Sequence, residues 1–174
     1  MVAACGSSPR NSVETGKNPA RPKAEEERLP DRQVRTDQIE IVQRDDQRQI
    51  AWKVRSKNSD VTLRGDGLVS GRLEQVQGEV FSQNKVASRF RARVAEADQA
   101  QQRLELRGEV EFKSLEPPLT LRADQVVWHA QTRRLRAQGN VRLSSDVYEM
   151  GPFRELWASP DLREVGTPET WKTK

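Results

Sequence analysis

Few side chains in this sequence have the chemistry of a catalytic centre. His129 is the only histidine and Cys5 is the only cysteine. A lone histidine on a strand is most often a surface residue, and a single cysteine can form neither an internal disulfide nor a multi-cysteine metal site. The sequence also lacks a glycine-rich phosphate-binding loop. We therefore predict that the chain is not an enzyme and that it has no catalytic residue, metal site or cofactor.

Cys5 is a candidate lipidation site because small residues precede it. The start of the chain, MVAACG, resembles the end of a bacterial lipoprotein signal, although the basic start and apolar stretch of such a signal are not in the sequence. Two interpretations stay open: a lipoprotein signal whose first part is missing, and a cytoplasmic protein with an ordinary cysteine. Residues 6–35 favour the first. Their prolines and alternating charges predict a disordered tether, which lipid or a missing segment would hold at a membrane.

The charged residues do not indicate a nucleic-acid partner. The sequence has 30 Lys and Arg against 26 Asp and Glu, mixed along the chain, and only 5% aromatic residues. A nucleic-acid surface concentrates its cations and adds aromatic side chains for stacking. Arg89, Arg91 and Arg93 alternate with apolar residues, so we expect them on a solvated outer face.

The elements that carry the remaining candidate residues are predicted to be strands. From Thr36 onward apolar and polar residues alternate, as in Ile50, Trp52 and Val54, and this period of two is the pattern of a half-buried strand. With 34% hydrophobic residues, the core can only be thin. We predict one all-β domain at 37–166, preceded by a linker at 1–36 and followed by a tail at 167–174.

One pattern occurs twice along these strands. The stretches at 103–112 and 134–143 read RLELRGEVEF and RLRAQGNVRL, each with a glycine, Gly108 or Gly139, in a predicted inward position. A glycine there lets a strand bend or lets another backbone approach. The apolar phase slips by one residue at Val94–Ala95, and again one repeat later, which predicts a bulge in each strand. Stacked antiparallel strand pairs of this kind would form one continuous apolar face.

The order of these motifs resembles the LptC family of periplasmic lipopolysaccharide-export proteins, whose fold is shared by LptA and the amino-terminal part of LptD. The resemblance extends over about residues 37–165, and the order of the short motifs carries it. The motifs are IAWKV at 50–54, ARVAEADQAQQRLELRGEVEF at 92–112, LTL followed by ADQVVWHAQTRRLRAQGNVRL at 123–143, and ELWASPDLREV at 155–165. Members of this family commonly begin with a membrane-spanning helix, which this sequence does not contain.

The resemblance implies a twisted, open antiparallel β-jellyroll of stacked strand pairs, whose apolar interior holds the acyl chains of lipid A. It also implies a protein in the periplasm, associated with the inner membrane. Such a protein accepts lipopolysaccharide from the inner-membrane ABC transporter, on its LptF/LptG side, and passes it to the LptA bridge.

Alternation and the resemblance together give the candidate residues. The side chains expected inside, and therefore candidates for lipid contact, are Trp52, Val54, Phe90, Val94, Leu104, Leu106, Val110, Phe112, Leu121, Trp128, Leu135, Val141 and Leu143. The resemblance further implies partner-binding edges at Ile39 and Ile41 for the transporter, and at Leu156, Leu162 and Val165 for LptA.

Three other interpretations stay open: an LptA-like soluble lipopolysaccharide bridge, a carbohydrate-binding β-sandwich, and a structural repeat protein whose filled interior binds nothing. The same alternating side chains would line a packed core equally well. A carbohydrate site usually presents a row of exposed aromatic residues, whereas Trp52 and Trp128 fall in inward phases.

Overall fold

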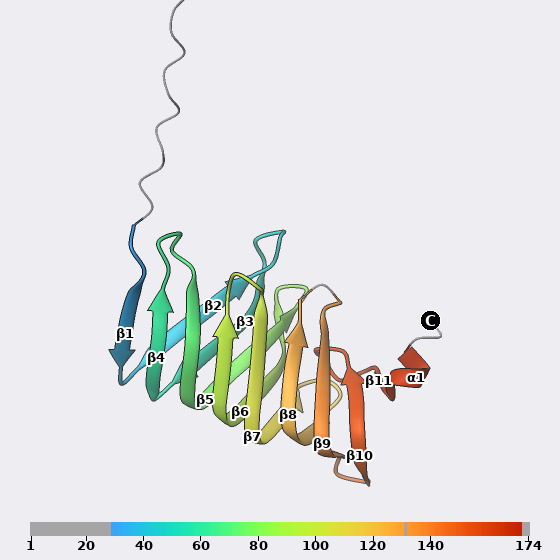
Figure 1. Cartoon of the computed structure of the whole chain (residues 1–174). Coiled ribbons are helices and arrows are strands. Elements are labelled where there is room, and N and C mark those ends of the chain that lie inside the picture. The colour runs from blue at the N-terminus through green and yellow to red at the C-terminus, as the bar shows by residue number, and fades with distance from the viewer. Residues whose placement is uncertain (1–28, 131, 172–174) are drawn as a thin grey trace, which may run out of the picture.

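The computed structural model describes residues 29–130 and 132–171, and most of them lie in one open antiparallel β-sheet, as the alternation predicts (Figure 1). Cys5, with residues 1–28 of the predicted linker, lies outside the described residues. The described part ends in a short helix, α1 (Pro168–Trp171), and contains no helix long and apolar enough to cross a membrane. The strands are β1 (Arg32–Thr36), β2 (Ile39–Arg44), β3 (Ile50–Ser56), β4 (Asn58–Leu63), β5 (Val69–Ser82), β6 (Lys85–Asp98), β7 (Arg103–Ser114), β8 (Thr120–His129), β9 (Arg134–Ser144), β10 (Glu149–Ala158) and β11 (Val165–Gly166).

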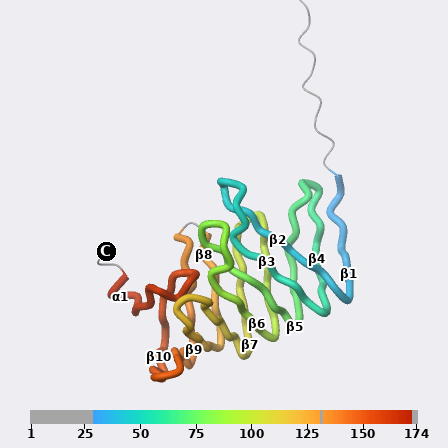
Figure 2. The backbone as a smooth tube through the Cα atoms, turned by 180° about the vertical axis from the view of Figure 1, so that it is seen from behind, coloured from blue at the N-terminus to red at the C-terminus, as the bar shows by residue number. Residues whose placement is uncertain are grey.

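The sheet divides at β5, because different strands pair with its two halves. β4 pairs with residues 69–74 of β5, whereas β3 pairs with residues 77–80. β1 is added beyond β4, and β2 beyond β3. Figure 1 shows β2 and β3 crossing behind the other strands, and Figure 2 shows the same pair from the opposite side. The sheet is therefore folded into two layers.

We call these the front layer and the back layer, and each long strand contributes one half to each of them. The front layer consists of β1, β4, β11 and residues 69–74, 94–98, 103–107, 125–129, 134–138 and 155–158. The back layer consists of β2, β3 and residues 76–82, 85–91, 110–114, 120–123, 141–144 and 149–153.

Bulges at the same level in neighbouring strands mark the bend between the layers. The register shifts by one residue between β6 and β7, between β7 and β8, and between β8 and β9. The bulge in β7 contains Gly108 and Glu109, and that in β9 contains Gly139 and Asn140, all with positive φ. Glycine reaches such φ values without steric cost. The prediction that the two repeated glycines bend their strands is confirmed.

The predicted inward orientation of these glycines is wrong. A Cβ built on Gly108 would meet the side chain of Arg93, and one built on Gly139 would meet Asp124, both of which are exposed. The bulge explains the difference, because two residues with positive φ interrupt the alternation of faces. The two glycines therefore belong to the outer corner of the sheet.

The apolar faces of the two layers pack on each other in a single core. Buried side chains of every strand from β2 to β10 contribute to one cluster, whereas β1 is exposed and contributes none. Large and small residues alternate across the front layer, where Ala95, Leu106, Val126, Ala137 and Leu156 are neighbours in successive strands. Burial of this continuous apolar surface is the main stabilising contribution to the fold.

The structure differs from the predicted domain bounds at both ends. β1 lies within the segment predicted as linker, and α1 lies within the predicted tail. β1 has no buried residue, so no apolar alternation marks it in the sequence. Backbone pairing with β4 and an ion pair between Arg35 and Asp60 at 3.2 Å hold it in place.

Gly78 is required where β3, β5 and β6 meet. It lies between Val54 and Phe90 in register, and the Phe90 ring covers the space that a side chain at position 78 would occupy. An added Cβ would overlap this ring and the carbonyl oxygen of Lys53. We expect Gly78→Ala to lower the free energy of unfolding by about 1–3 kcal/mol through overpacking. Urea denaturation checks this, with Gln77→Ala on the exposed face as the control. Equal midpoints for the two variants would contradict it.

Candidate functional site

The candidate site is the apolar interior between the two layers. Twelve of the predicted lining residues have exposed fractions of only 0–4%; they are Trp52, Val54, Phe90, Leu104, Leu106, Val110, Phe112, Leu121, Trp128, Leu135, Val141 and Leu143. In the back layer Phe90 and Phe112 stack with ring centroids 5.2 Å apart. The structure thus brings these residues together on the inner faces.

Val94 is the exception among the predicted lining residues. Its side chain is only half-buried, whereas Ala95 is fully buried. The register shift in β6 falls between Arg91 and Val94, so the inward phase passes to Ala95 and Ala97 after the bulge. The phase slip at Val94–Ala95 is confirmed, and the assignment of Val94 to the interior is corrected.

A mouth between the layers lies on the side opposite the bend. A cavity of about 630 Å³ opens there, between the turn joining β2 to β3 in the back layer and the turn joining β6 to β7 in the front layer. Trp128 and Ala51 belong to its lining, and both are buried members of the core. The cavity therefore reaches from solvent to the edge of the apolar interior.

Polar contacts bridge this mouth. Gln99 Nε2 donates to the backbone oxygen of Val42 at 2.9 Å, while Gln99 Oε1 accepts from the backbone N–H of Val69 at 2.8 Å. Gln102 Nε2 donates to Asp46 at 3.0 Å, and Arg133 lies 3.6 Å from the Asp45 carboxylate. The end of β2 and the β2–β3 turn are thus fastened to the front layer by side chains alone, and no backbone ladder crosses here within the described residues.

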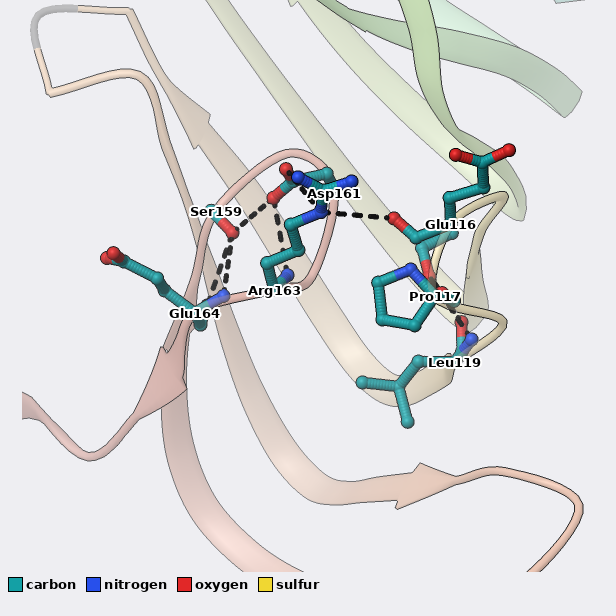
Figure 3. A network of polar contacts seen from close by, with 8 residues as sticks. Glu116, Pro117, Leu119, Ser159, Asp161, Arg163 and Glu164 are labelled. Carbon is teal, nitrogen blue, oxygen red and sulfur yellow. Dashed lines mark hydrogen bonds and ion pairs between the residues drawn. The ribbon is translucent and has the colours of Figure 1, made fainter.

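The loop 159–164, between β10 and β11, covers the gap between the two layers at that end of the sheet. Ser159 Oγ donates a hydrogen bond to Asp161 at 2.6 Å, and the Arg163 guanidinium donates to the backbone oxygen of Glu116 at 3.4 Å. Figure 3 shows both contacts. Leu162 of the same loop is 2% exposed and belongs to the core. The loop therefore connects β10 to the β7–β8 turn of the back layer and places one leucine between the layers.

The predicted partner residues lie on β2, on β10 and β11, and, for Leu162, in the loop 159–164, but several of their side chains face inward. β2 pairs only with β3 among the described strands, so its outer backbone edge is open. Ile41 and Leu156 are buried, as is Leu162, and their side chains cannot contact a partner directly. Ile39 and Val165 are half-buried and pack against the core. What the edges offer is mainly their backbone, as in strand addition.

The outer face of the back layer has a buried carboxylate among cations. Glu111, with 7% of its side chain exposed, lies 3.0 Å from Arg122 and 3.2 Å from both Arg91 and Lys113. Burial opposes its ionisation, but hydrogen bonds from these three cations outweigh that effect and lower the pKa of Glu111. The predicted outward direction of the arginine row is confirmed for Arg91, which is exposed and paired here.

A second polar cluster, not predicted from the sequence, lies on the outer face of the front layer. Glu155 accepts from Arg136 at 2.9 and 2.8 Å, from Gln138 at 2.9 Å and from the Trp157 indole at 2.9 Å. The Trp157 ring stacks on His129 with centroids 5.9 Å apart. Burial, followed by the charges of Arg136 and Arg103, lowers the pKa of His129. The histidine expected at the surface is thus half-buried against a tryptophan.

Glu155 should make folding sensitive to acid. The hydrogen bond from Arg136, with those from Trp157 and Gln138, lowers the pKa of Glu155 from 4.5 to about 2. A depressed folded-state pKa stabilises the fold above the unfolded-state value, and this contribution is lost as pH falls from about 5 toward 2. We expect Glu155→Gln to lower the free energy of unfolding by about 2–3 kcal/mol at pH 7 and by little at pH 2.

Chemical denaturation at several pH values measures this effect. Glu149→Gln is the matched control, because Glu149 pairs with Arg142 at an exposed position where ion pairs contribute little. A loss for Glu155→Gln that stayed constant from pH 7 to pH 2 would show that its ionisation does not matter to the fold.

No protein-family model and no curated protein matches this sequence.

Proposed function

We propose that the protein binds lipopolysaccharide in the periplasm as an LptC-like component of the Lpt export machinery. In this proposal it accepts the lipid from the inner-membrane ABC transporter, on the LptF/LptG side, and passes it to the LptA bridge. The acyl chains of lipid A occupy the interior between the layers. The protein is held at the inner membrane by lipid on Cys5 or by a preceding segment.

One observation carries the proposal: a continuous apolar interior lies between two layers that continuous strands join along one side only. Every methylene of an acyl chain that leaves water for such a lining contributes about 0.8 kcal/mol. An open sheet also lets a chain enter and leave sideways, which a transfer protein requires. The order of sequence motifs that resembles the LptC family supports the same function.

The open strand edges support the proposed partners. Within the part of the chain that the structure describes, β2 has a free backbone edge in the back layer and β1 has one in the front layer, whereas β11 ends the sheet at its other side. Unpaired edges readily accept a further strand by backbone hydrogen bonds. In the proposal, the edge near Ile39 and Ile41 meets the transporter, and the edge near Val165 meets LptA.

The dense packing of the interior favours a second candidate function. Trp52, Leu121 and Val141 are completely buried by protein atoms, as expected for a sheet that binds partners at its edges and holds nothing inside. In the lipid-binding function, the acyl chains must replace contacts between the two layers. Uptake of lipid by the interior is therefore the property that separates the two candidates.

Photo-crosslinking tests this directly. A photoreactive residue at Leu106 or at Val141, both 0–1% exposed, is expected to form adducts when the protein is irradiated with lipopolysaccharide. The same residue at Arg91, on the exposed face, is expected to form none. Deacylated lipopolysaccharide serves as competitor, and it should not reduce the adducts because it lacks the chains. Adducts at Arg91 alone, or none at any position, would reject the proposal.

A further inference from the structure

The turn between β2 and β3 covers the cavity at the mouth. Two residues that line this cavity each have a polar side-chain atom without a hydrogen-bond partner in the part of the chain that the structure describes. Gln43 and Trp128 line this cavity and are 7% and 3% exposed. Gln43 Oε1 and Trp128 Nε1 are buried, and neither has a hydrogen-bond partner among the described residues. A buried polar group without a partner costs about 1–3 kcal/mol. Two residues of the cavity lining therefore carry one unused acceptor and one unused donor, both shielded from solvent while the turn is closed.

These groups define the chemistry of a fitting ligand. The acceptor comes from the back layer and the donor from the front layer, next to the apolar surfaces of Ala51 and Trp128. An apolar chain that carries a neutral hydroxyl or amide group can accept from Trp128 Nε1 and donate to Gln43 Oε1. A charged group fits less well, because each side chain offers a single neutral partner.

The contacts that hold the β2–β3 turn against the front layer are weak enough for the turn to open. The contacts that cross the mouth are the side-chain bonds of Gln99 and Gln102 and the long ion pair of Arg133. Each such bond contributes about 0.5–1.5 kcal/mol. Asp46 and Gln47, at the tip of the turn, are exposed, so only a few contacts hold the turn closed.

We infer that the mouth cavity is the entrance for an acyl chain bearing a hydroxyl or amide group, and that the β2–β3 turn is the latch that closes it. This inference rests on the proposed lipid-binding function and locates its entry point. Chains pass between the β2–β3 turn and the β6–β7 turn, and their polar group binds between Gln43 and Trp128.

A crosslink across the mouth tests the latch. Asp46 and Gln102 are joined by a 3.0 Å hydrogen bond, so cysteines at both positions, in a Cys5→Ser background, can be linked by a short, reducible bis-thiol reagent. Uptake of fluorescent lipopolysaccharide by the linked protein is expected to fall at least tenfold and to return after reduction. Gln99→Ala is expected to increase the association rate about three- to tenfold. Gln77→Ala, at an exposed position outside this cavity, should leave the rate unchanged.

A pair of tryptophan variants tests the binding chemistry. Trp128→Phe keeps the aromatic ring but removes the donor, and it is expected to weaken lipopolysaccharide binding about three- to tenfold. Trp157→Phe is the control, because it also removes an indole N–H but Trp157 lies on the outer face and does not line the cavity. Equal affinities for the two variants would overturn the assignment of Trp128.

The outcomes separate this inference from the proposed function. If the unlinked protein takes up no lipopolysaccharide, the proposed function fails. If it takes up the lipid and the linked protein does so equally fast, the latch fails while the proposed function stands.

Discussion

Replacing Trp52 by alanine is expected to lower the free energy of unfolding by about 3–5 kcal/mol. Trp52 is the largest of the completely buried side chains and belongs to β3, which together with β2 extends the back layer beyond β5. Its removal leaves a cavity that the surrounding strands cannot fill without moving. Urea denaturation followed by circular dichroism measures the loss.

Two further variants give this result its meaning. Trp52→Phe should lose much less, because it retains most of the buried ring and removes an indole N–H that has no partner. Trp157→Ala removes a tryptophan that is only half-buried on the outer face. If Trp157→Ala were as destabilising as Trp52→Ala, the core would not lie between the layers as described.

The alternation of apolar and polar residues predicts the strands and, for most positions, the side that each residue faces. This works because a strand with one buried face permits only one phase, as for Leu104 and Leu106 in β7. It fails for Val94 and the repeated glycines, where bulges change the phase. Which residue after a bulge turns inward depends on φ values and on the neighbouring strand, and a single sequence contains neither.

The edges and the polar clusters are less accessible to prediction. β1 buries no residue, so its sequence, RQVRT, carries no alternation of buried positions; its place comes from the backbone of β4. Glu111 looks like an ordinary outward residue of β7, but its partners come from β6 and β8 as well as from its own strand. Such clusters depend on the register between strands. The alternating pattern leaves that register free.

The mouth shows the same limit at the candidate site. Trp128 is predicted inside from its phase, and it is buried there. Its position at the edge of a cavity arises because the β2–β3 turn lies against the β6–β7 turn, more than fifty residues further along the chain, through Gln99 and Gln102. Nothing in the sequence distinguishes these two glutamines from the many exposed glutamines of this protein. The lining could therefore be predicted from the sequence, whereas its entrance required the structure.

The most severe single change expected is Val141→Asp. Val141 is completely buried in β9, where its register partner in β10 is Phe153, and the described core residues around it are all apolar. A carboxylate placed there has no compensating charge, so its pKa must rise and its ionised form must destabilise the fold. We expect the free energy of unfolding at pH 7 to fall by about 3 kcal/mol or more.

The dependence on pH identifies the cause of this loss. A carboxyl group whose folded-state pKa is raised destabilises the protein increasingly as pH rises above its unfolded-state pKa of about 4, so Val141→Asp should lose less at pH 4 than at pH 8. Arg142→Asp introduces the same carboxylate at the exposed neighbouring position. It should lower the free energy of unfolding far less, mainly because the ion pair with Glu149 is lost. Denaturation curves of both variants at the two pH values decide the matter. Similar losses at positions 141 and 142 would mean that β9 has no inner face, and an apolar interior for acyl chains would then have no structural basis.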